Sequence, residues 1–341
     1  MTSITNLEAA VRRDPSAFRV LTGDRPTGPL HVGHYFGTLE NRVRLQELGV
    51  ELFVLIADYQ TITDRDAPAT LSDDVEGVLA DYLAVGIDPA RATIFTHSRV
   101  PELNQLLLPF LSLVSVAELR RNPTVKEEIA AGGGATSALL FTYPVHQAAD
   151  ILFCRATLVP VGGDQLPHLE LARTIARRFN NRYSPERAYF PEPAALLGDV
   201  PLVLGLDGGK MGKSRGNAIA LAAGADETVR LIRGARTDAE RRITYEPERR
   251  PEVANLLRLA ALCLGRTPEE IAEEVGPRGA SALKRLVAEA LVERLRPVRE
   301  RRAAVAGERD YLRSILADGN ARARAIAAAT LEDVHALMHT G

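Results

Sequence analysis

Cysteine is scarce and tryptophan is absent: the chain of 341 residues has two cysteines and no tryptophan. Cys154 and Cys263 lack the spacing of a metal-binding motif, so we expect two buried thiols, as suits a reducing cytoplasm. No apolar run reaches the ~20 residues of a membrane helix, so we expect no membrane segment. Residues 1–6 show neither the basic nor the apolar region of a secretory signal.

An excess of charge of one sign is also lacking, because 42 Lys+Arg stand against 44 Asp+Glu, a formal net charge of −2. This balance excludes a surface coated with positive charge for DNA, although a basic face can be offset by acidic surface elsewhere. The length suggests about two domains. A hydrophobic share of 46% is enough for a substantial core.

A strand, a tight turn and a helix follow one another near the N-terminus. Residues 18–21 are a short apolar run that predicts a buried strand. A helix is predicted to begin near Leu30, so its positive end and free backbone N–H groups would face an anion. The turn between them is rich in residues that break regular structure, namely Gly23, Pro26, Gly28 and Pro29.

His31 and His34 lie three residues apart in this predicted helix, so both imidazoles point at the same volume. Gly33 has no side chain, which lets a planar base or sugar lie directly on the backbone. Two ordinary helix histidines are the alternative interpretation. Their position directly after a strand and a Gly/Pro turn favours a nucleotide site.

Strands and helices alternate in the following part of the chain. Residues 52–57 and Ala92–Thr96 are predicted strands on either side of a helix at Leu71–Val85. This order predicts the α/β class, with a Rossmann-like parallel sheet. Polar residues 58–63, Gln60 among them, follow the second strand, where open α/β sheets bind ligands. Further predicted elements are a long helix over 102–121, strands over Leu158–Val161 and 200–206, and a helix over 166–179.

Asp150 is the second candidate site residue. Pro144 suits the first position of a helix, from which Gln147 and Asp150 would project on one face. An unpaired buried carboxylate is costly, so Asp150 requires a partner, either a neighbouring loop that it caps or a bound donor. We favour the bound donor. Asp164 follows two glycines at a predicted N-cap, where it would cap the helix or accept from ribose hydroxyls.

Residues 207–217 form a glycine-rich loop with the lysines Lys210 and Lys213 and the hydroxyl of Ser214. In isolation the loop is either an ordinary solvated turn or a mobile anion-binding segment. From residue 218 the chain is predicted to be nearly all helical. The predicted helices are 226–233, Pro251–Leu264, Pro268–Val275, 280–306, 308–318 and 321–339.

The sequence therefore predicts a Rossmann-like domain over 1–217 and an all-helical domain over 218–341. Within the first domain, a helical insertion over 100–155 has a wide apolar face that needs a partner, either its own domain or another subunit. Arginines crowd the second domain, where they would form a solvated face or neutralise RNA phosphates. They are Arg241, Arg242, Arg249, Arg250, Arg294, Arg296, Arg299, Arg301 and Arg302.

Two stretches resemble the signatures of class I aminoacyl-tRNA synthetases. His31-Val32-Gly33-His34 has the form of the HIGH motif, which related nucleotidyltransferases also carry, and Lys210-Met211-Gly212-Lys213-Ser214 resembles Lys-Met-Ser-Lys-Ser. Over residues 18–341 the chain is similar to the bacterial tryptophanyl-tRNA synthetase family. The other stretches that carry this resemblance are 22–28, 81–88, 142–152 and 159–165.

The resemblance implies a homodimer that activates L-tryptophan with ATP and Mg²⁺ and transfers it to tRNA(Trp). By the resemblance, His31, His34, Lys210, Lys213 and Ser214 are catalytic. Tryptophan would be surrounded by Leu21, Gln60, Tyr143, Gln147, Asp150 and Gln165. ATP would be bound by Arg25, Pro26, Thr27, Gly33, His34, Gly162, Gly163, Asp164, Leu202, Lys210, Met211, Gly212, Lys213 and Ser214.

Three alternatives stay open. Tyr143, Gln147 and Asp150 are also spaced as in the tyrosine pocket of tyrosyl-tRNA synthetases, and pocket size would decide between the two amino acids. Gly212 replaces the serine of the family motif, so a catalytically quiet paralogue that binds tryptophan or a partner protein would keep the same fold. A dinucleotide-forming nucleotidyltransferase should lack the lysine-rich loop and the long helical C-terminus.

Overall fold

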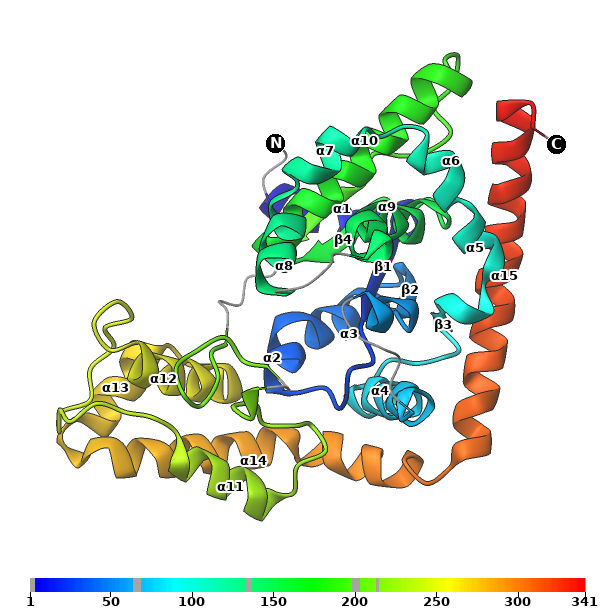
Figure 1. Ribbon diagram of the computed structural model, residues 1–341. Helices are drawn as coiled ribbons and strands as arrows, with labels where there is room; N and C mark the ends of the chain where they lie inside the picture. Colours follow the sequence, from blue (N-terminus) through cyan, green and yellow to red (C-terminus); the bar gives the residue numbers. More distant parts are fainter. Residues whose placement is uncertain (1–3, 64–68, 133–136, 198–202, 213–214, 341) are drawn as a thin grey trace.

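The computed structural model describes residues 4–63, 69–132, 137–197, 203–212 and 215–340 (Figure 1). Its centre is a five-stranded parallel sheet in the order β3-β2-β1-β4-β5. The chain runs from β1 outward to β2 and β3, then continues on the other side of β1, which makes the β1–β4 boundary a topological switch point. The strands are β1 (Arg19–Asp24), β2 (Glu51–Ile56), β3 (Ala92–Thr96), β4 (Leu158–Val161) and β5 (Ala194–Leu197).

Helices surround the sheet and continue beyond it in an L-shaped C-terminal part (Figure 1). A π-helical turn, Tyr35–Leu39, joins α2 to α3. None of the described helices is long and apolar enough to cross a membrane. The helices are α1 (Ile4–Arg13), α2 (Val32–His34), α3 (Glu40–Glu47), α4 (Leu71–Val85), α5 (Pro101–Gln105), α6 (Leu107–Leu111), α7 (Val116–Arg121), α8 (Pro123–Gly132), α9 (Ala138–Leu152), α10 (Leu166–Tyr183), α11 (Ala225–Gly234), α12 (Pro251–Leu264), α13 (Pro268–Val275), α14 (Gly279–Val305) and α15 (Arg309–Met338).

Side chains of each strand alternate between two hydrophobic cores, one on each face of the sheet. In β2, Leu52, Val54 and Ile56 belong to the core shared with α4, whereas Phe53 and Leu55 belong to the core shared with α9 and α10. Both faces are therefore covered, which explains why β2 is apolar along nearly its whole length. The predicted Rossmann-like sheet is confirmed.

The long helix predicted over residues 102–121 is wrong, because the segment forms the three short helices α5, α6 and α7. Pro109 has no N–H to continue the hydrogen-bond ladder of α5. Ser115 then starts α7 as its N-cap, where its hydroxyl accepts from the N–H of Glu118 at 3.2 Å.

Two further boundaries differ from the prediction. Pro144 lies inside α9 rather than at its start, since the helix begins at Ala138 with the Ser137 hydroxyl accepting from Leu140 N–H at 3.0 Å. The fifth strand of the described sheet is β5, which the sequence analysis did not predict. Of the predicted strand over 200–206, residues 200–202 lie outside the described residues, and residues 203–206 contribute an isolated bridge between Leu204 and Lys210 rather than a strand.

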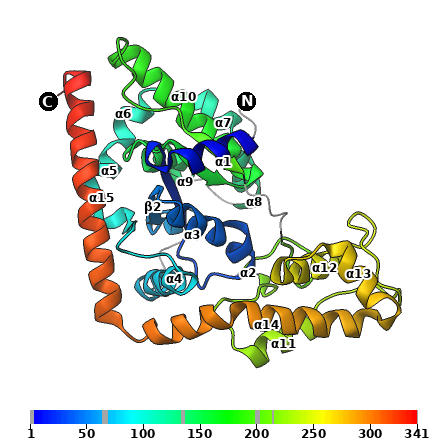
Figure 2. The ribbon, with the colours of Figure 1, turned by 180° about the vertical axis from the view of Figure 1, so that it is seen from behind.

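The C-terminal helix α15 is one helix, not the two that were predicted over 308–318 and 321–339. A glycine at position 319 suggests a break, but here it lets the helix backbone approach β3 closely. A Cβ at Gly319 would lie 1.8 Å from the carbonyl oxygen of Ile94 in β3. The next residue, Asn320, accepts from the N–H of Thr96 at 2.9 Å. α15 therefore runs along the edge of the sheet, as Figures 1 and 2 show.

Arg302 connects α14 to α4, because its Nε donates to Asp81 Oδ1 at 2.6 Å. Asp81 is fully buried in α4, and its other oxygen accepts from the N–H of Leu30 at 2.9 Å. One carboxylate thus connects the helical part to the turn before His31. The division at residue 217 stays a prediction, but both long C-terminal helices pack directly on the sheet and its helices.

Replacing Arg302 by alanine should lower the free energy of unfolding by about 3 kcal/mol, because it leaves the carboxylate of Asp81 buried and short of its cation. Urea denaturation measures this change. Arg296→Ala is the matched control on the same helix: its exposed pairs with Glu293 and Glu300 should contribute no more than about 0.5 kcal/mol. Equal destabilisation by the two variants would contradict a special role for Arg302.

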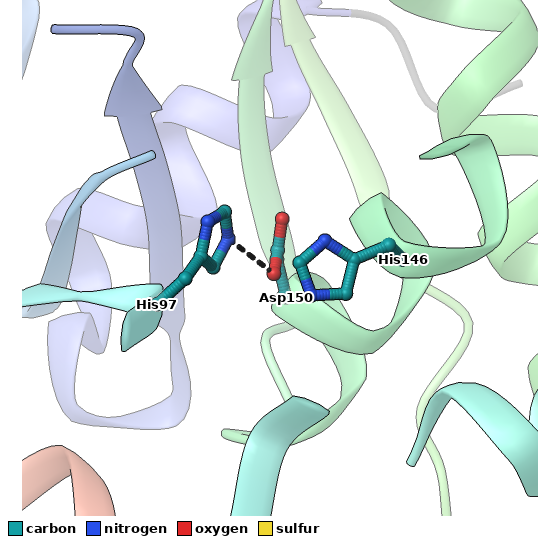
Figure 3. Close-up of side chains that lie close together, drawn as sticks. All are labelled: His97, His146 and Asp150. Carbon is teal, nitrogen blue, oxygen red and sulfur yellow. Dashed lines mark hydrogen bonds and ion pairs between the residues drawn. The ribbon is translucent and has the colours of Figure 1, made fainter. Parts of the chain in front are cut away.

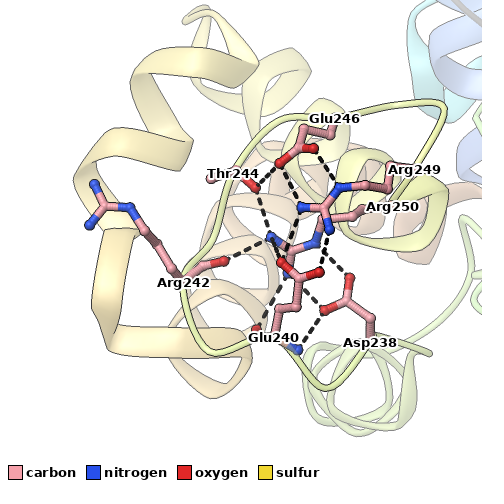
Figure 4. A network of polar contacts seen from close by, with 7 residues as sticks. All are labelled: Asp238, Glu240, Arg242, Thr244, Glu246, Arg249 and Arg250. Atoms are coloured by element: carbon pink, nitrogen blue, oxygen red, sulfur yellow. Dashed lines mark hydrogen bonds and ion pairs between the residues drawn. The ribbon is translucent and has the colours of Figure 1, made fainter.

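Two of the arginines before α12, Arg249 and Arg250, form ion pairs within the protein. Arg250 is buried and donates to both carboxylate oxygens of Asp238, at 2.7 and 2.8 Å, and to Thr244 Oγ1 at 2.8 Å. Arg249 pairs with Glu240 and Glu246, as Figure 4 shows. These two guanidinium groups hold the loop between α11 and α12 together. Their presence is explained by these contacts within the protein, without the predicted neutralisation of RNA phosphates.

Candidate functional site

A cavity of about 660 Å³ opens at the carboxyl ends of β1, β2 and β4, at the switch point of the sheet. It collects most of the predicted site residues from segments that are far apart in the sequence. These are Leu21, Arg25, Thr27, His31, His34, Gln60, Tyr143, Gln147, Asp150, Gly162, Gln165, Lys210, Met211 and Gly212.

The remaining predicted residues have three different outcomes. Pro26, Gly33 and Gly163 belong to the segments around the cavity but do not line it. Asp164 lies in the 3₁₀ turn Gly163–Gln165, and Gln165 holds the N-cap position of α10, so the predicted N-cap position of Asp164 is wrong, while its predicted binding role stays a prediction. The predictions for Leu202, Lys213 and Ser214 lie outside the described residues.

The two imidazoles lie at the start of the helix that follows β1. Their ring centroids are 3.7 Å apart, and the N–H of His31 donates to Nδ1 of His34 at 3.2 Å. A Cβ on Gly33 would lie 3.0 Å from His31 Nδ1 and 3.2 Å from Met211 Sδ. Glycine is therefore needed here because the histidine pair and the lysine-rich loop both approach its backbone.

The two signature segments are held side by side by backbone hydrogen bonds. Val32 N–H donates to the carbonyl of Ile219 at 2.9 Å, and Leu221 N–H donates to the carbonyl of Leu30 at 2.9 Å. These bonds fix residues just after the lysine-rich loop against the residues that begin the histidine helix. The predicted approach of the two segments is thus present in the backbone itself.

Asn217 organises the lysine-rich loop. Its side-chain oxygen accepts from Gly212 N–H at 2.9 Å, and its amide donates to Asp207 Oδ1 at 2.7 Å and to the carbonyl of Lys210 at 3.1 Å. The hydrogen bond from Asn217 is the main reason why the pKa of Asp207 is lowered. Within the part of the chain that the structure describes, the nearest atoms that a Cβ at Gly212 would meet belong to Arg215, at 3.8 Å, so these residues leave space for the serine that the family motif normally has here.

α9 lines the cavity with Tyr143, Gln147 and Asp150, which lie on one face of the helix. Asp150 is 1% exposed, and Oδ1 of its carboxylate lies 2.8 Å from His97 Nε2. The partner that a buried carboxylate requires is therefore His97, which the sequence analysis missed. Its signal was present, since His97 directly follows β3 at the same edge of the sheet.

Asp24, Arg42 and Tyr82 form a second buried group that the sequence analysis missed. Arg42 Nη1 donates to Asp24 Oδ2 at 2.5 Å, and the Tyr82 hydroxyl donates to the same oxygen at 2.8 Å. Burial opposes ionisation of Asp24, but Arg42 and then His34 outweigh it and hold the pKa of Asp24 well below its ordinary value. This group fixes the end of β1 beside the histidine pair.

His97, His146 and Asp150 are the candidate metal ligands among the described residues, with ligand atoms within 4.8 Å of one another (Figure 3). Nε2 of each ring is already hydrogen-bonded within the protein: that of His97 to Asp150, and that of His146 to the Asn104 side-chain oxygen at 2.8 Å. Burial lowers the pKa of His146. The cluster is therefore held together by its own hydrogen bonds, and the amino-acid-binding role of Asp150 stays a prediction.

A parallel sheet with a cavity at its switch point is typical of α/β proteins that bind a nucleotide or another small ligand there. The lining of this cavity adds the cationic side chains of Arg25 and Lys210 and the carboxylate of Asp150. Comparison with known proteins makes the assignment specific. A family model described as "tRNA synthetases class I (W and Y)" matches residues 14–296.

Relatives and a solved structure agree. The tryptophan–tRNA ligase of Lactococcus lactis subsp. lactis (strain IL1403) is 42% identical over 94% of this chain and 97% of its own length. That of Clostridium longisporum is 41% identical over 92% and 95%. The crystal structure of tryptophanyl-tRNA synthetase from Campylobacter jejuni with ADP and tryptophan has a TM-score of 0.80 and 30% identity, over 94% of this chain and 99% of that one. The chain belongs to the class I tRNA synthetases of the W and Y type.

Proposed function

We propose that the chain is a tryptophan–tRNA ligase. It activates L-tryptophan with ATP to tryptophanyl-adenylate and transfers the amino acid to tRNA(Trp), releasing AMP and pyrophosphate. The observation that carries this proposal is the cavity whose lining combines Asp150 with His34 and Lys210. The tryptophan–tRNA ligases of L. lactis and C. longisporum support the same substrate.

Asp150 suits tryptophan for a chemical reason. The indole N–H can only donate, and an ionised carboxylate can only accept. A tyrosine hydroxyl would also need a donor for its oxygen, but the ring N–H of His97 beside Asp150 is already used by the carboxylate. A site that leaves one polar group of a competing substrate unpaired discriminates against it.

ATP would lie with its phosphates between the histidine helix and the lysine-rich loop. Arg25, His34, Lys210 and the backbone at Gly162 line this end. They offer donors that suit a triphosphate, and the carboxylate there, Asp24, is occupied by Arg42 and Tyr82. Mg²⁺ would therefore be bound through the phosphate oxygens, where it neutralises part of their charge.

The tryptophan carboxylate attacks the α-phosphorus in line, so this step requires no nucleophilic side chain. His34 and Lys210, joined by Lys213 as proposed from the motif, stabilise the charge that moves to pyrophosphate. Asp150, Gln147 and Tyr143 hold the amino acid in position, so catalysis works by orientation and electrostatics. The terminal ribose hydroxyl of tRNA(Trp) then accepts the acyl group.

The protein is further proposed to act as a homodimer in the cytoplasm. Leu108 and Val116 in α6 and α7 are 76% and 58% exposed, which supports an apolar contact surface in the predicted interface region 100–155. Both cysteines are free thiols, in keeping with a reducing compartment. The long helical C-terminal part would hold tRNA(Trp).

Amino-acid-dependent exchange of pyrophosphate into ATP tests the function of the purified chain. We expect exchange with tryptophan and at least about 10³-fold lower kcat/KM with tyrosine, because a site with fixed polar partners discriminates strongly. Exchange with tyrosine alone would assign the protein to the other branch of the family. Tryptophan binding without any exchange would indicate the catalytically quiet alternative.

A further inference from the structure

His97 is a buried titratable residue that the activation chemistry does not itself use. It is 0% exposed and lies between two carboxylates: Nε2 is 2.8 Å from Asp150 Oδ1, and Nδ1 is 3.8 Å from Asp58 Oδ1. His97 does not line the cavity, whereas Asp150 does. Figure 3 shows the Asp150 carboxylate between the two histidines: the His97 imidazole points at it from one side, and His146 lies on the other side.

The surroundings of His97 keep the ring in one place. Asn104 donates to its backbone carbonyl at 2.9 Å, and the Tyr59 ring stacks on the imidazole with centroids 6.1 Å apart. Asp58 accepts from the N–H of Ser98, the next residue, at 3.2 Å. These hydrogen bonds fix the backbone at His97. The ring itself lies against Tyr59 and against His146, whose centroid is 4.6 Å away, so it cannot turn away from Asp150 without losing these two ring contacts.

We propose that His97 is a positioning residue for amino-acid recognition: it holds one oxygen of Asp150 and leaves the other free to accept the N–H of the substrate. This inference rests on the proposed function. The ring binds Oδ1 and thereby fixes the rotation of the carboxylate. As an imidazolium, it also places a positive charge beside a carboxylate in a buried site, where an uncompensated charge would be costly.

The charge on His97 gives the proposal a pH dependence. Burial alone would lower the pKa of His97, but Asp150 and, to a smaller extent, Asp58 outweigh it and raise the pKa above its ordinary value. The titratable groups that face the ring, within the described part of the chain, are these two carboxylates, Tyr59 and His146. Below its pKa His97 is cationic. At a pH above the pKa of His97, the ring is neutral and no longer balances the charge of the two carboxylates. The affinity for tryptophan should therefore fall as the pH rises through the pKa of His97.

Calorimetric titration of the full chain with tryptophan between pH 6 and 9 tests the proposal. For wild type we expect the Kd to rise with pH. His97→Gln should lose this pH-dependent step, because the amide still donates to Asp150 but does not titrate. His97→Leu should weaken binding about 10- to 100-fold at every pH, since it removes a hydrogen bond to a charged group.

His146→Gln is the matched control, because it replaces the second buried histidine beside the same carboxylate and should keep the step. The amino group of tryptophan titrates equally in all variants, so the ratio of wild-type to variant Kd isolates His97. An unchanged step in His97→Gln, or binding by His97→Leu within about threefold of wild type, would overturn the proposal. A wild-type chain that binds no tryptophan at any pH would instead overturn the proposed function.

Discussion

Replacing His34 by alanine should reduce kcat for tryptophan-dependent pyrophosphate exchange by about 10²- to 10³-fold, the range measured when one preorganised donor to a developing charge is removed. The loss should appear in kcat and in KM for ATP. The affinity for tryptophan should stay within about threefold, because the proposed contacts of the amino acid are made by Asp150, Gln147 and Tyr143 rather than by His34. Steady-state exchange with each substrate varied in turn separates these quantities.

Lys210 provides the matched comparison for His34, because it brings a cation to the same phosphate end from the other signature segment. Lys210→Met should lose rate in the same way, whereas Lys210→Arg, which keeps the charge, should retain more of it. If both Lys210 variants exchanged at the wild-type rate, the lysine-rich loop would not act on the triphosphate at all.

Asp150→Asn should lower kcat/KM for tryptophan by about 10²- to 10³-fold, because it removes the charge from a buried hydrogen-bonded pair and leaves His97 without its carboxylate. The expected split is a large rise in KM for tryptophan with little change in KM for ATP. Exchange kinetics measure both constants on one preparation.

Circular dichroism and thermal unfolding of Asp150→Asn provide the necessary control, because the kinetic constants can be compared with wild type only if the variant is folded. The Asp226→Asn variant removes an exposed carboxylate in the first turn of α11, away from the cavity, and should leave both KM values unchanged. An Asp150→Asn enzyme with wild-type KM for tryptophan would show that another group recognises the indole.

Local pattern was enough to predict the elements that carry their own signals. The helix Leu71–Val85 and the strand Ala92–Thr96 have the predicted bounds, because apolar periodicity and turn residues mark both ends. The segment after β1 was equally readable, since a strand, a Gly/Pro turn and a helix follow in close order. These patterns were sufficient to place the cavity at the edge where β1, β2 and β4 end.

Features that depend on distant segments could not be predicted in the same way. A glycine such as Gly319 is typical of a helix break. The structure explains it instead by the close approach of Ile94, more than two hundred residues earlier in the chain. Arg302 was predicted to be part of a solvated or RNA-binding face, whereas its charge pairs with buried Asp81. The sequence required a partner for Asp150, and the position of His97 directly after a predicted strand was the only signal for it, because nothing local connects the two residues.

A crystal structure of the full chain with tryptophan and a non-hydrolysable ATP analogue tests the central claim most directly, namely that both signature segments converge on one nucleotide. We predict a triphosphate that contacts His34 and Lys210 at once, with the indole N–H on the free oxygen of Asp150. A nucleotide bound in the cavity while either His34 or Lys210 points into solvent would contradict the account.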